Sequence, residues 1–265
     1  MLALLAQLTP GGESPGADAR RAAAAIRERP EAELAVFPEL FLGGYRLKNP
    51  GGVACDPDGD ELATVAAACA EAHTAALIGF TERTPLGFHN SVACIDETGK
   101  LVVAYRKAQL FGAETAAFRP GAWLEVVGLA GRRVAPLICF DIEFPELPRA
   151  AAMAGADLFV TCAANMEPFG REHRLHATAR ALENRVPHIY VNRPGREEGM
   201  RFVGESCAID ADGVVIRAAG NGEEIFLAEV GMAGVGDTRV DYLSFDPTRM
   251  PVEVRFKSPA KGGAR

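Results

Sequence analysis

The alternation of short apolar segments with alanine-rich segments constrains the fold of this chain more than any other feature. Apolar runs at 2–7, 34–37 and 75–80 alternate with helical patterns at 17–27 and 61–72. Strands separated by single helices of this length are typical of α/β proteins, in which helical crossovers join parallel strands. The pattern therefore predicts an α/β fold.

Two pairs of predicted strands are joined by turns of hairpin length. The strands at 91–95 and 101–105 are separated by five residues, and those at 203–209 and 214–217 by four residues, each turn containing a glycine. Hairpins pair strands antiparallel, so the predicted sheets are mixed and not purely parallel. Between the hairpins we expect strand 134–138, helix 146–153, strand 158–161, helix 171–184 and strand 188–192.

Chain length and organisation favour a single domain spanning residues 1–265. No internal repeat, low-complexity block or long Gly/Pro-rich linker divides the sequence. A chain of this length often forms one α/β domain. Beyond Tyr242 the sequence is rich in proline and charge, and an irregular tail is predicted from about residue 243.

Charge and hydropathy argue against nucleic acid and membranes as partners. Lys and Arg number 28 against 35 Asp and Glu, which gives a net charge of −7, and no long basic run could neutralise a row of phosphates. The apolar segment Met1–Ala6 lacks a basic flank and is too short for a signal or membrane segment. It is predicted to be a buried strand.

Cysteine and histidine spacing indicates neither disulfides nor a metal. The six cysteines form no C-x-x-C pair, and the five histidines show no metal-ligand spacing. Unpaired cysteines suit a reducing compartment, so a cytoplasmic location is expected, with no metal and no cofactor.

Cys139 is the first candidate for chemistry because it ends an apolar strand and is soon followed by a helix. Ligands bind at strand ends in α/β sheets, and amides at a helix N-terminus would lower the pKa of a thiol placed there. Cysteine at a strand end is nevertheless more often a buried structural residue. Cys162 also ends a strand and is a rival, and position alone does not choose between the two.

Three charged residues follow strands in the same way. Glu39 stands just beyond the strand at 34–37, Lys107 closes the strand at 101–105, and Glu114 lies in the connection after it. Each of them alone would usually be a solvated surface residue.

Taken together, these residues resemble the signatures of the nitrilase (carbon-nitrogen hydrolase) superfamily. Glu39 lies in Phe-Pro-Glu-Leu, Lys107 in Tyr-Arg-Lys-Ala-Gln-Leu-Phe-Gly, and Cys139 in Leu-Ile-Cys-Phe-Asp-Ile-Glu-Phe-Pro-Glu. The order and context of the three motifs match, and Glu114 matches an additional glutamate of the family. The resemblance extends over nearly the whole chain.

The resemblance implies a catalytic set and its roles. Cys139 would be the nucleophile, Glu39 the general base and acid, and Lys107 with a backbone amide after Cys139 the oxyanion donors. Glu114 would either orient Lys107 or assist proton transfer. No step of this chemistry requires a metal or nucleotide.

The chain departs from the family pattern in two places. Ala108 and Gln109 replace the threonine and histidine that commonly follow the lysine. Pro136 interrupts a strand that ought to be central, where proline removes a ladder hydrogen bond. Both departures concern the pocket walls and leave the assignment of the nucleophile unchanged.

The region around Cys139 is most similar to amidases that act on short aliphatic amides, including ω-amino amides such as 5-aminopentanamide. The expected substrate-binding residues are Phe140, Glu143, Asn165 and Met166. Glu143 would attract a substrate amine, although a carboxylate is also favoured there by the dipole of the following helix.

Three alternatives stay open: a carbamoyl-amine or nitrile hydrolase on the same site, a catalytically silent binding member of the fold, and a different cysteine hydrolase. The last is disfavoured because Cys139 lacks the flanking glycines of a nucleophile elbow.

The resemblance also implies an architecture and an assembly. We expect a four-layer α-β-β-α sandwich that forms a homodimer, with the helix Arg171–Asn184 at the interface. The same helix could instead be an ordinary amphipathic packing helix.

Overall fold

The computed structural model describes residues 1–12 and 14–233. Within them, most strands belong to two six-stranded sheets, and β10 (Pro194–Glu197) and β11 (Met200–Val203) form a separate hairpin. The tail predicted from about residue 243 lies outside the described residues.

The first sheet has the strand order β14-β1-β2-β3-β4-β5. Neighbours β1, β2 and β3 are parallel, whereas β14, β4 and β5 pair antiparallel, so the prediction of mixed sheets is confirmed. The elements of this half are β1 (Leu2–Gln7), α1 (Pro15–Arg27), β2 (Leu34–Val36), the short 3-10 helix η1 (Pro50–Gly52), α2 (Asp60–Ala72), β3 (Ala75–Thr84), β4 (Gly87–Ile95), β5 (Leu101–Arg106), α3 (Glu114–Ala117) and β14 (Glu224–Glu229).

The second sheet has the order β13-β12-β9-β8-β7-β6, with β7, β8 and β9 parallel. The turn predicted at 210–213 joins β12 and β13 as an antiparallel hairpin. The elements of this half are β6 (Val127–Leu129), β7 (Arg132–Ile138), the 3-10 helix η2 (Cys139–Glu143), α4 (Glu146–Met153), β8 (Leu158–Ala163), α5 (Gly170–Asn184), β9 (His188–Asn192), β12 (Cys207–Ile209) and β13 (Val215–Ala218).

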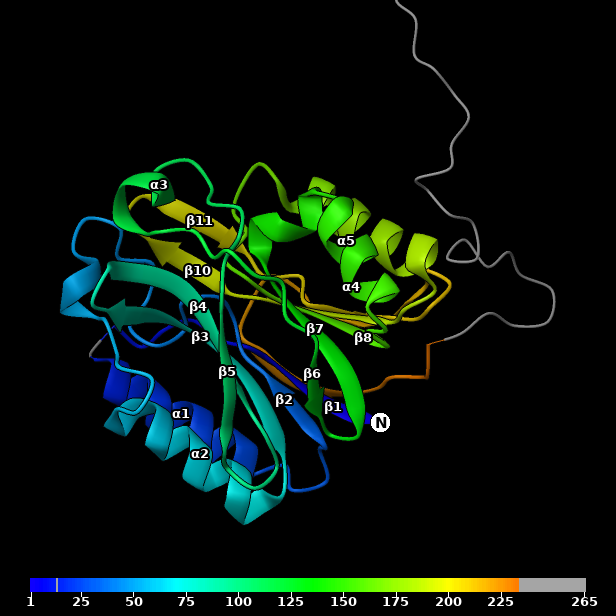
Figure 1. Ribbon diagram of the computed structural model, residues 1–265, viewed down its shortest axis with the longest axis horizontal. Helices are drawn as coiled ribbons and strands as arrows, with labels where there is room; N and C mark the ends of the chain where they lie inside the picture. The colour runs from blue at the N-terminus through cyan, green and yellow to red at the C-terminus, as the bar shows by residue number, and fades with distance from the viewer. Residues whose placement is uncertain (13, 234–265) are drawn as a thin grey trace, which may run out of the picture.

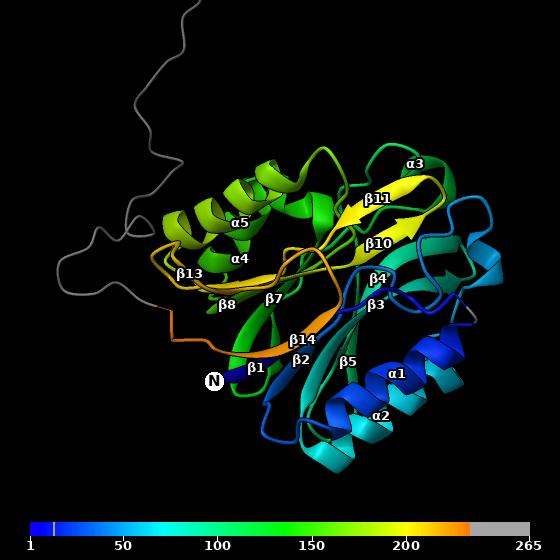
Figure 2. The ribbon, with the colours of Figure 1, turned by 180° about the vertical axis from the view of Figure 1, so that it is seen from behind.

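The two sheets pack face to face, and each carries a pair of helices on its outer face (Figures 1 and 2). The alternation of side chains along β1 explains why both faces of the first sheet are covered. Ala3 and Leu5 belong to the core shared with the second sheet, while Leu4 and Ala6 belong to the core beneath α1 and α2. Both faces of the strand are therefore apolar, and the predicted four-layer α-β-β-α sandwich is confirmed.

The position of β7 explains how its sheet tolerates Pro136. The neighbouring strand β6 pairs only with Arg132–Val134, so β7 has no β6 partner at Pro136. Proline is found where no ladder hydrogen bond is required of its nitrogen. β7 is thus central, between β6 and β8, as expected, but it has no partner on the β6 side at Pro136.

The predicted strand 203–209 was wrong in its extent. The chain forms β11 up to Val203, leaves the ladder at Gly204–Ser206, and resumes as β12 at Cys207. Gly204 and Glu205 both adopt positive φ, +67° and +59°, which breaks the strand. The buried N-terminal strand is confirmed, and no helix among the described residues has the length and apolar character needed to cross a membrane.

Candidate active site

Four side chains from separate stretches of sequence meet at one edge of the sandwich, where β2, β5 and β7 end. Glu39 follows β2, Lys107 follows β5, Glu114 opens α3, and Cys139 follows β7. Glu39 and Lys107 are each 1% exposed and Glu114 is 0% exposed, whereas Cys139 retains 8%. The structure thus brings together all four residues proposed from the sequence.

Lys107 lies between the two carboxylates. Its Nζ donates to Glu39 Oε1 at 2.7 Å and to Glu114 Oε1 at 2.9 Å, and it lies 2.8 Å from Glu114 Oε2 in the same ion pair. Burial alone would lower the pKa of Lys107, but the charges of Glu114 and Glu39 outweigh it and raise that pKa. Lys107 is therefore a fixed, charged ammonium.

Glu39 is held by three donors. Besides Lys107, Asn90 Nδ2 donates to Oε1 at 2.7 Å and the backbone N–H of Ala164 donates to Oε2 at 2.7 Å. Burial raises the pKa of Glu39 in spite of the charge on Lys107, and the charge on Glu114 raises it further. A carboxylate with a raised pKa is a stronger base than an ordinary surface glutamate.

Glu114 is fixed from a different side. Tyr45 Oη donates to Glu114 Oε1 at 2.6 Å, and the N–H of Phe111 donates to Oε2 at 2.9 Å. Asn90 Nδ2 also reaches Oε1 at 3.4 Å, so Asn90 bridges the two carboxylates.

The thiol of Cys139 differs from the sequence-based expectation. Burial and the charge on Glu39 raise the pKa of Cys139 well above its usual value, so the predicted lowering by helix amides was wrong. The element after Cys139 is the five-residue 3-10 helix η2, and its amides do not offset burial beside two carboxylates. Cys139 itself has φ +44°, a left-handed conformation that is strained for a residue with a side chain.

Close backbone packing brings these segments together. A Cβ at Gly79 in β3 would lie 2.4 Å from both Leu40 N and Pro38 O, so only glycine lets the Glu39 loop sit on β3. A Cβ at Gly121 would likewise lie 2.2 Å from Arg106 O, next to Lys107.

Asp141 ties the Cys139 turn to the Lys107 segment. It accepts from the N–H of Ile138 at 3.0 Å, from Tyr105 Oη at 2.8 Å and from the N–H of Gln109 at 2.8 Å. Burial raises the pKa of Asp141 to about 6, although these hydrogen bonds oppose the rise.

Cys139 lines a small pocket with an empty volume of about 250 Å³. All four residues expected from the sequence to bind substrate line it: Phe140, Glu143, Asn165 and Met166. Phe111, Phe169 and His173 complete the wall. Cys162, the rival thiol, is wholly buried and is not part of this lining.

Sequence reasoning missed the neutral partners of the cluster. Tyr45, Asn90 and the backbone of Ala164 carry no charge and have no motif of their own. Asn90 could have been noticed as a polar residue just before the apolar part of a strand. Tyr45 follows two glycines, Gly43 and Gly44, both with positive φ, and the glycine pair was the available signal.

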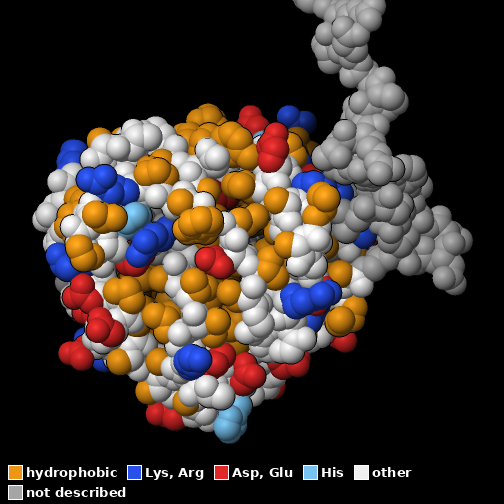
Figure 3. Space-filling model, viewed as in Figure 1, with side chains coloured by type: hydrophobic (Ala, Val, Ile, Leu, Met, Phe, Trp, Pro, Cys, Tyr) orange, Lys and Arg blue, Asp and Glu red, His pale blue; other side chains and the backbone are white. Residues whose placement is uncertain are grey.

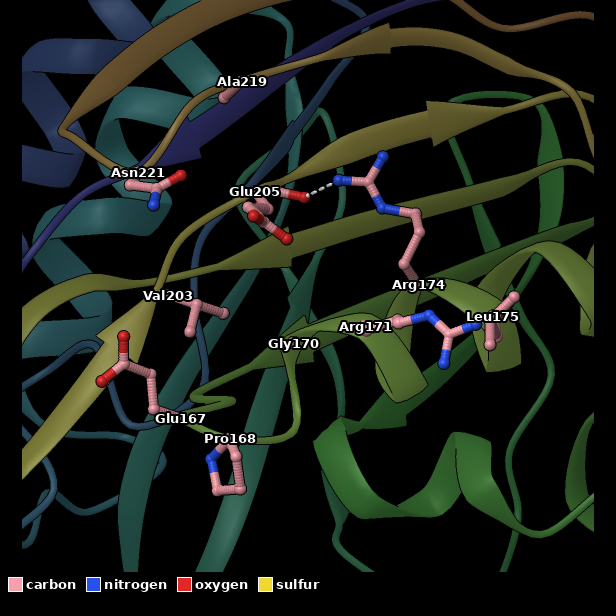
Figure 4. A pocket seen from close by; sticks show the side chains of 10 residues that line it. All are labelled: Glu167, Pro168, Gly170, Arg171, Arg174, Leu175, Val203, Glu205, Ala219 and Asn221. Carbon is pink, nitrogen blue, oxygen red and sulfur yellow. Dashed lines mark hydrogen bonds between the residues drawn. The ribbon is translucent and has the colours of Figure 1, made fainter.

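A wider and shallower groove lies beside the N-terminal end of α5 (Figure 4). Arg174 of α5 crosses it and donates to the carbonyl of Glu205 at 2.6 Å. Its lining includes none of the four clustered residues. Among the described residues no group of three or more His, Cys, Asp or Glu side chains is placed to hold a metal.

Residues 4–240 match the family model for carbon-nitrogen hydrolase. An (R)-stereoselective amidase of a Pseudomonas species is 35% identical over 214 residues, which cover 80% of this chain and 78% of that protein. A nitrilase of Pyrococcus abyssi is 29% identical over 246 residues, 90% of this chain and 92% of that protein.

Solved structures agree with these sequence relatives. An amidase of the nitrilase superfamily from Nesterenkonia sp. AN1 superposes with a TM-score of 0.82 at 26% identity, covering 94% of both chains. The same amidase has been solved with butyramide and with the acetamide moiety of fluoroacetamide added covalently to its active-site cysteine.

Proposed function

This chain belongs to the carbon-nitrogen hydrolase family of the nitrilase superfamily, and on that premise we propose that it hydrolyses small aliphatic amides to a carboxylate and ammonia. One observation carries the proposal: a buried carboxylate–ammonium–carboxylate cluster adjoins a thiol that lines a small pocket. The butyramide complex of the Nesterenkonia amidase supports a short acyl chain.

The charge of the cluster explains how a thiol with a raised pKa can react. With Glu39 and Glu114 ionised and Lys107 protonated, the cluster carries one net negative charge. Losing the Cys139 proton to solvent would add a second buried charge, whereas passing it to Glu39 leaves the total unchanged. Glu39 therefore accepts the proton as sulfur attacks the substrate carbonyl carbon.

Negative charge then develops on the carbonyl oxygen. Lys107 Nζ has three N–H donors, and its two carboxylate partners leave one for that oxygen. The backbone N–H of Phe140, directly after the nucleophile, is the second donor of this proposal. Each such donor lowers the barrier by roughly 2.7–4 kcal/mol.

Collapse of this intermediate completes the cycle. Glu39 returns its proton to the amide nitrogen, and the C–N bond breaks. Ammonia departs, and the acyl group remains on Cys139 as a thioester. Glu39 then takes a proton from water, the resulting hydroxide attacks the thioester carbon, and the C–S bond breaks. The thiol regains its proton and the carboxylic acid ionises after release.

Ammonia release from acetamide, butyramide, 5-aminopentanamide, a carbamoyl amine and a nitrile tests the proposal. Cys139→Ala is expected to abolish release with an unchanged unfolding temperature, and Glu39→Gln to lower the rate at least about a hundredfold. Turnover by Cys139→Ala would refute the mechanism, and turnover of the nitrile alone would refute the amidase assignment.

A homodimer and a cytoplasmic location complete the proposal. Leu175 and Leu182 on the outer face of α5 are 53% and 41% exposed, and Met153 of α4 is 59% exposed. Their exposure supports an isologous contact through these helices, as expected from the sequence. All six cysteines are free, which supports a reducing compartment.

A further inference from the structure

The pocket beside Cys139 has one ionisable pair in its wall besides the thiol, where Glu143 meets His173. Glu143 Oε1 lies 3.0 Å from His173 Nε2, and His173 Nδ1 lies 3.1 Å from Tyr190 Oη. The Glu143 side chain is 29% exposed, whereas His173 is 3% exposed. Buried His173 thus fixes the Glu143 carboxylate on one side, and part of the Glu143 side chain remains accessible to a ligand.

Three phenyl rings line the same pocket in edge-to-face contact. The ring of Phe111 lies 5.3 Å from that of Phe140 and 5.8 Å from that of Phe169. Phenyl faces attract an alkylammonium ion, and several rings with a carboxylate form a stronger site than either group alone. No lysine or arginine is among the residues that line this pocket.

We propose that Glu143 and the rings of Phe111, Phe140 and Phe169 bind a protonated amine on the acyl chain of the substrate. This inference rests on the proposed amidase function, because the amide of the same molecule must reach Cys139. The hydrogen bond from His173 lowers the pKa of Glu143 and keeps it ionised at neutral pH.

The side-chain amide of Asn165 is a second polar group in the pocket. Asn165 is 3% exposed, and its Nδ2 is a buried donor without a hydrogen-bond acceptor among the described residues. A buried donor left unpaired costs free energy, which a ligand acceptor would recover. An ammonium offers only donors, so the acceptor for Asn165 is an oxygen of the substrate amide, and the two groups address different ends of one molecule.

The preferred substrate is therefore a short aliphatic amide with a terminal ammonium. The methylenes between the two ends would contact Met166 and the phenyl rings. A substrate with a terminal carboxylate would meet Glu143 with like charge and bind poorly.

Three amides of similar length test this inference: 5-aminopentanamide, neutral pentanamide and the monoamide of glutaric acid. Glu143→Gln keeps an acceptor for His173 and removes the charge. We expect kcat/KM for 5-aminopentanamide to fall about tenfold or more, mainly through a higher KM. The kcat/KM for pentanamide should stay within about twofold of the wild-type value, and that for the glutaric monoamide should rise. Glu146→Gln, at an exposed carboxylate three residues away, should change none of the three.

Binding of pentylammonium, measured by calorimetry, gives a readout that does not need turnover. Wild-type protein should bind it and Glu143→Gln should not. Equal losses for 5-aminopentanamide and pentanamide, or pentylammonium binding that survives Glu143→Gln, would overturn the subsite. If pentanamide is still hydrolysed through Cys139, the amidase proposal stands without it; if wild type hydrolyses no amide of the panel, the amidase proposal itself fails.

Discussion

Tyr45 is a neutral hydrogen-bond donor to the charged cluster. It is 2% exposed, and its hydroxyl donates to Glu114 Oε1 at 2.6 Å. Its own backbone is fixed, because the N–H of Tyr45 donates to Glu197 Oε2 at 2.9 Å. A Cβ at the preceding Gly44 would lie 2.5 Å from Glu197 Oε1, so the approach requires glycine. Burial and Glu114 raise the pKa of Tyr45, which keeps the hydroxyl protonated as a donor.

Tyr45→Phe should therefore change catalysis through electrostatics. Losing a hydrogen bond to a charged group costs about 1.5–3 kcal/mol, so we expect kcat to fall about tenfold or more. With the Glu114 charge less compensated, the pKa of Glu39 should rise further, because Glu114 already raises it. Since the base must be deprotonated, the acid limb of the pH–rate profile should move to higher pH. A uniform loss at every pH would indicate a purely structural role.

The β2–β3 pair is the element on which the position of Glu39 depends. The loop after β2 lies against Gly79 of β3, with Phe37 N donating to Leu77 O at 2.9 Å and Gly79 N to Pro38 O at 3.2 Å. Leu40, directly after Glu39, has φ +49°, so the loop turns sharply there. From this turn the Glu39 carboxylate reaches Lys107 Nζ at 2.7 Å.

Gly79→Ala should displace this loop and remove activity. The added Cβ meets backbone atoms at 2.4 Å, and overpacking of this kind costs typically about 1–3 kcal/mol of folding free energy. We expect ammonia release to fall at least about a hundredfold, with the thiol of Cys139 still titratable. Gly128→Ala in strand β6 is the matched control, because a Cβ there meets nothing within 4 Å. Equal activity of the two variants would contradict this account.

These contacts also show what the sequence could and could not predict. Short apolar runs located β1, β7 and β9, and turns of hairpin length located the hairpins β4–β5 and β12–β13, because each of these signals is local in sequence. The motifs identified four candidate catalytic residues: Glu39, Lys107, Glu114 and Cys139. The sequence does not give the distances between their side chains. The raised pKa of Cys139 was not predictable, since it depends on burial and on a carboxylate that is distant in sequence. Strands β6 (VGL) and β10 (PGRE) were missed because each contains a glycine, and β10 also a proline and two charged residues, so neither is a continuous apolar run.

The outer face of the second sheet carries the helices through which the proposed dimer would form. α4 and α5 cover that sheet, and hydrophobic side chains are interspersed with charged ones on the surface of the molecule (Figures 1 and 3). On α5, Leu175 and Leu182 are seven residues apart, which places them on one face of the helix. The turn before β13 lies beside Leu182, since a Cβ at Gly213 would be 3.0 Å from Leu182 Cβ. α5 also supplies His173 to the pocket, so a contact across this helix would stabilise the pocket wall.

Replacing Leu175 and Leu182 with glutamate should therefore separate the proposed dimer and weaken catalysis together. Charges at the centre of an isologous contact face like charges from the second copy and cannot be desolvated. In sedimentation at micromolar concentration we expect wild-type dimers and monomers of the double variant, with kcat/KM reduced several-fold because α5 loses its support. Leu86→Glu is the matched control, since Leu86 is 71% exposed in the turn between β3 and β4, away from both helices. A wild-type protein that sediments as a monomer would exclude the dimer, and a fully active monomeric variant would show that the pocket wall needs no partner.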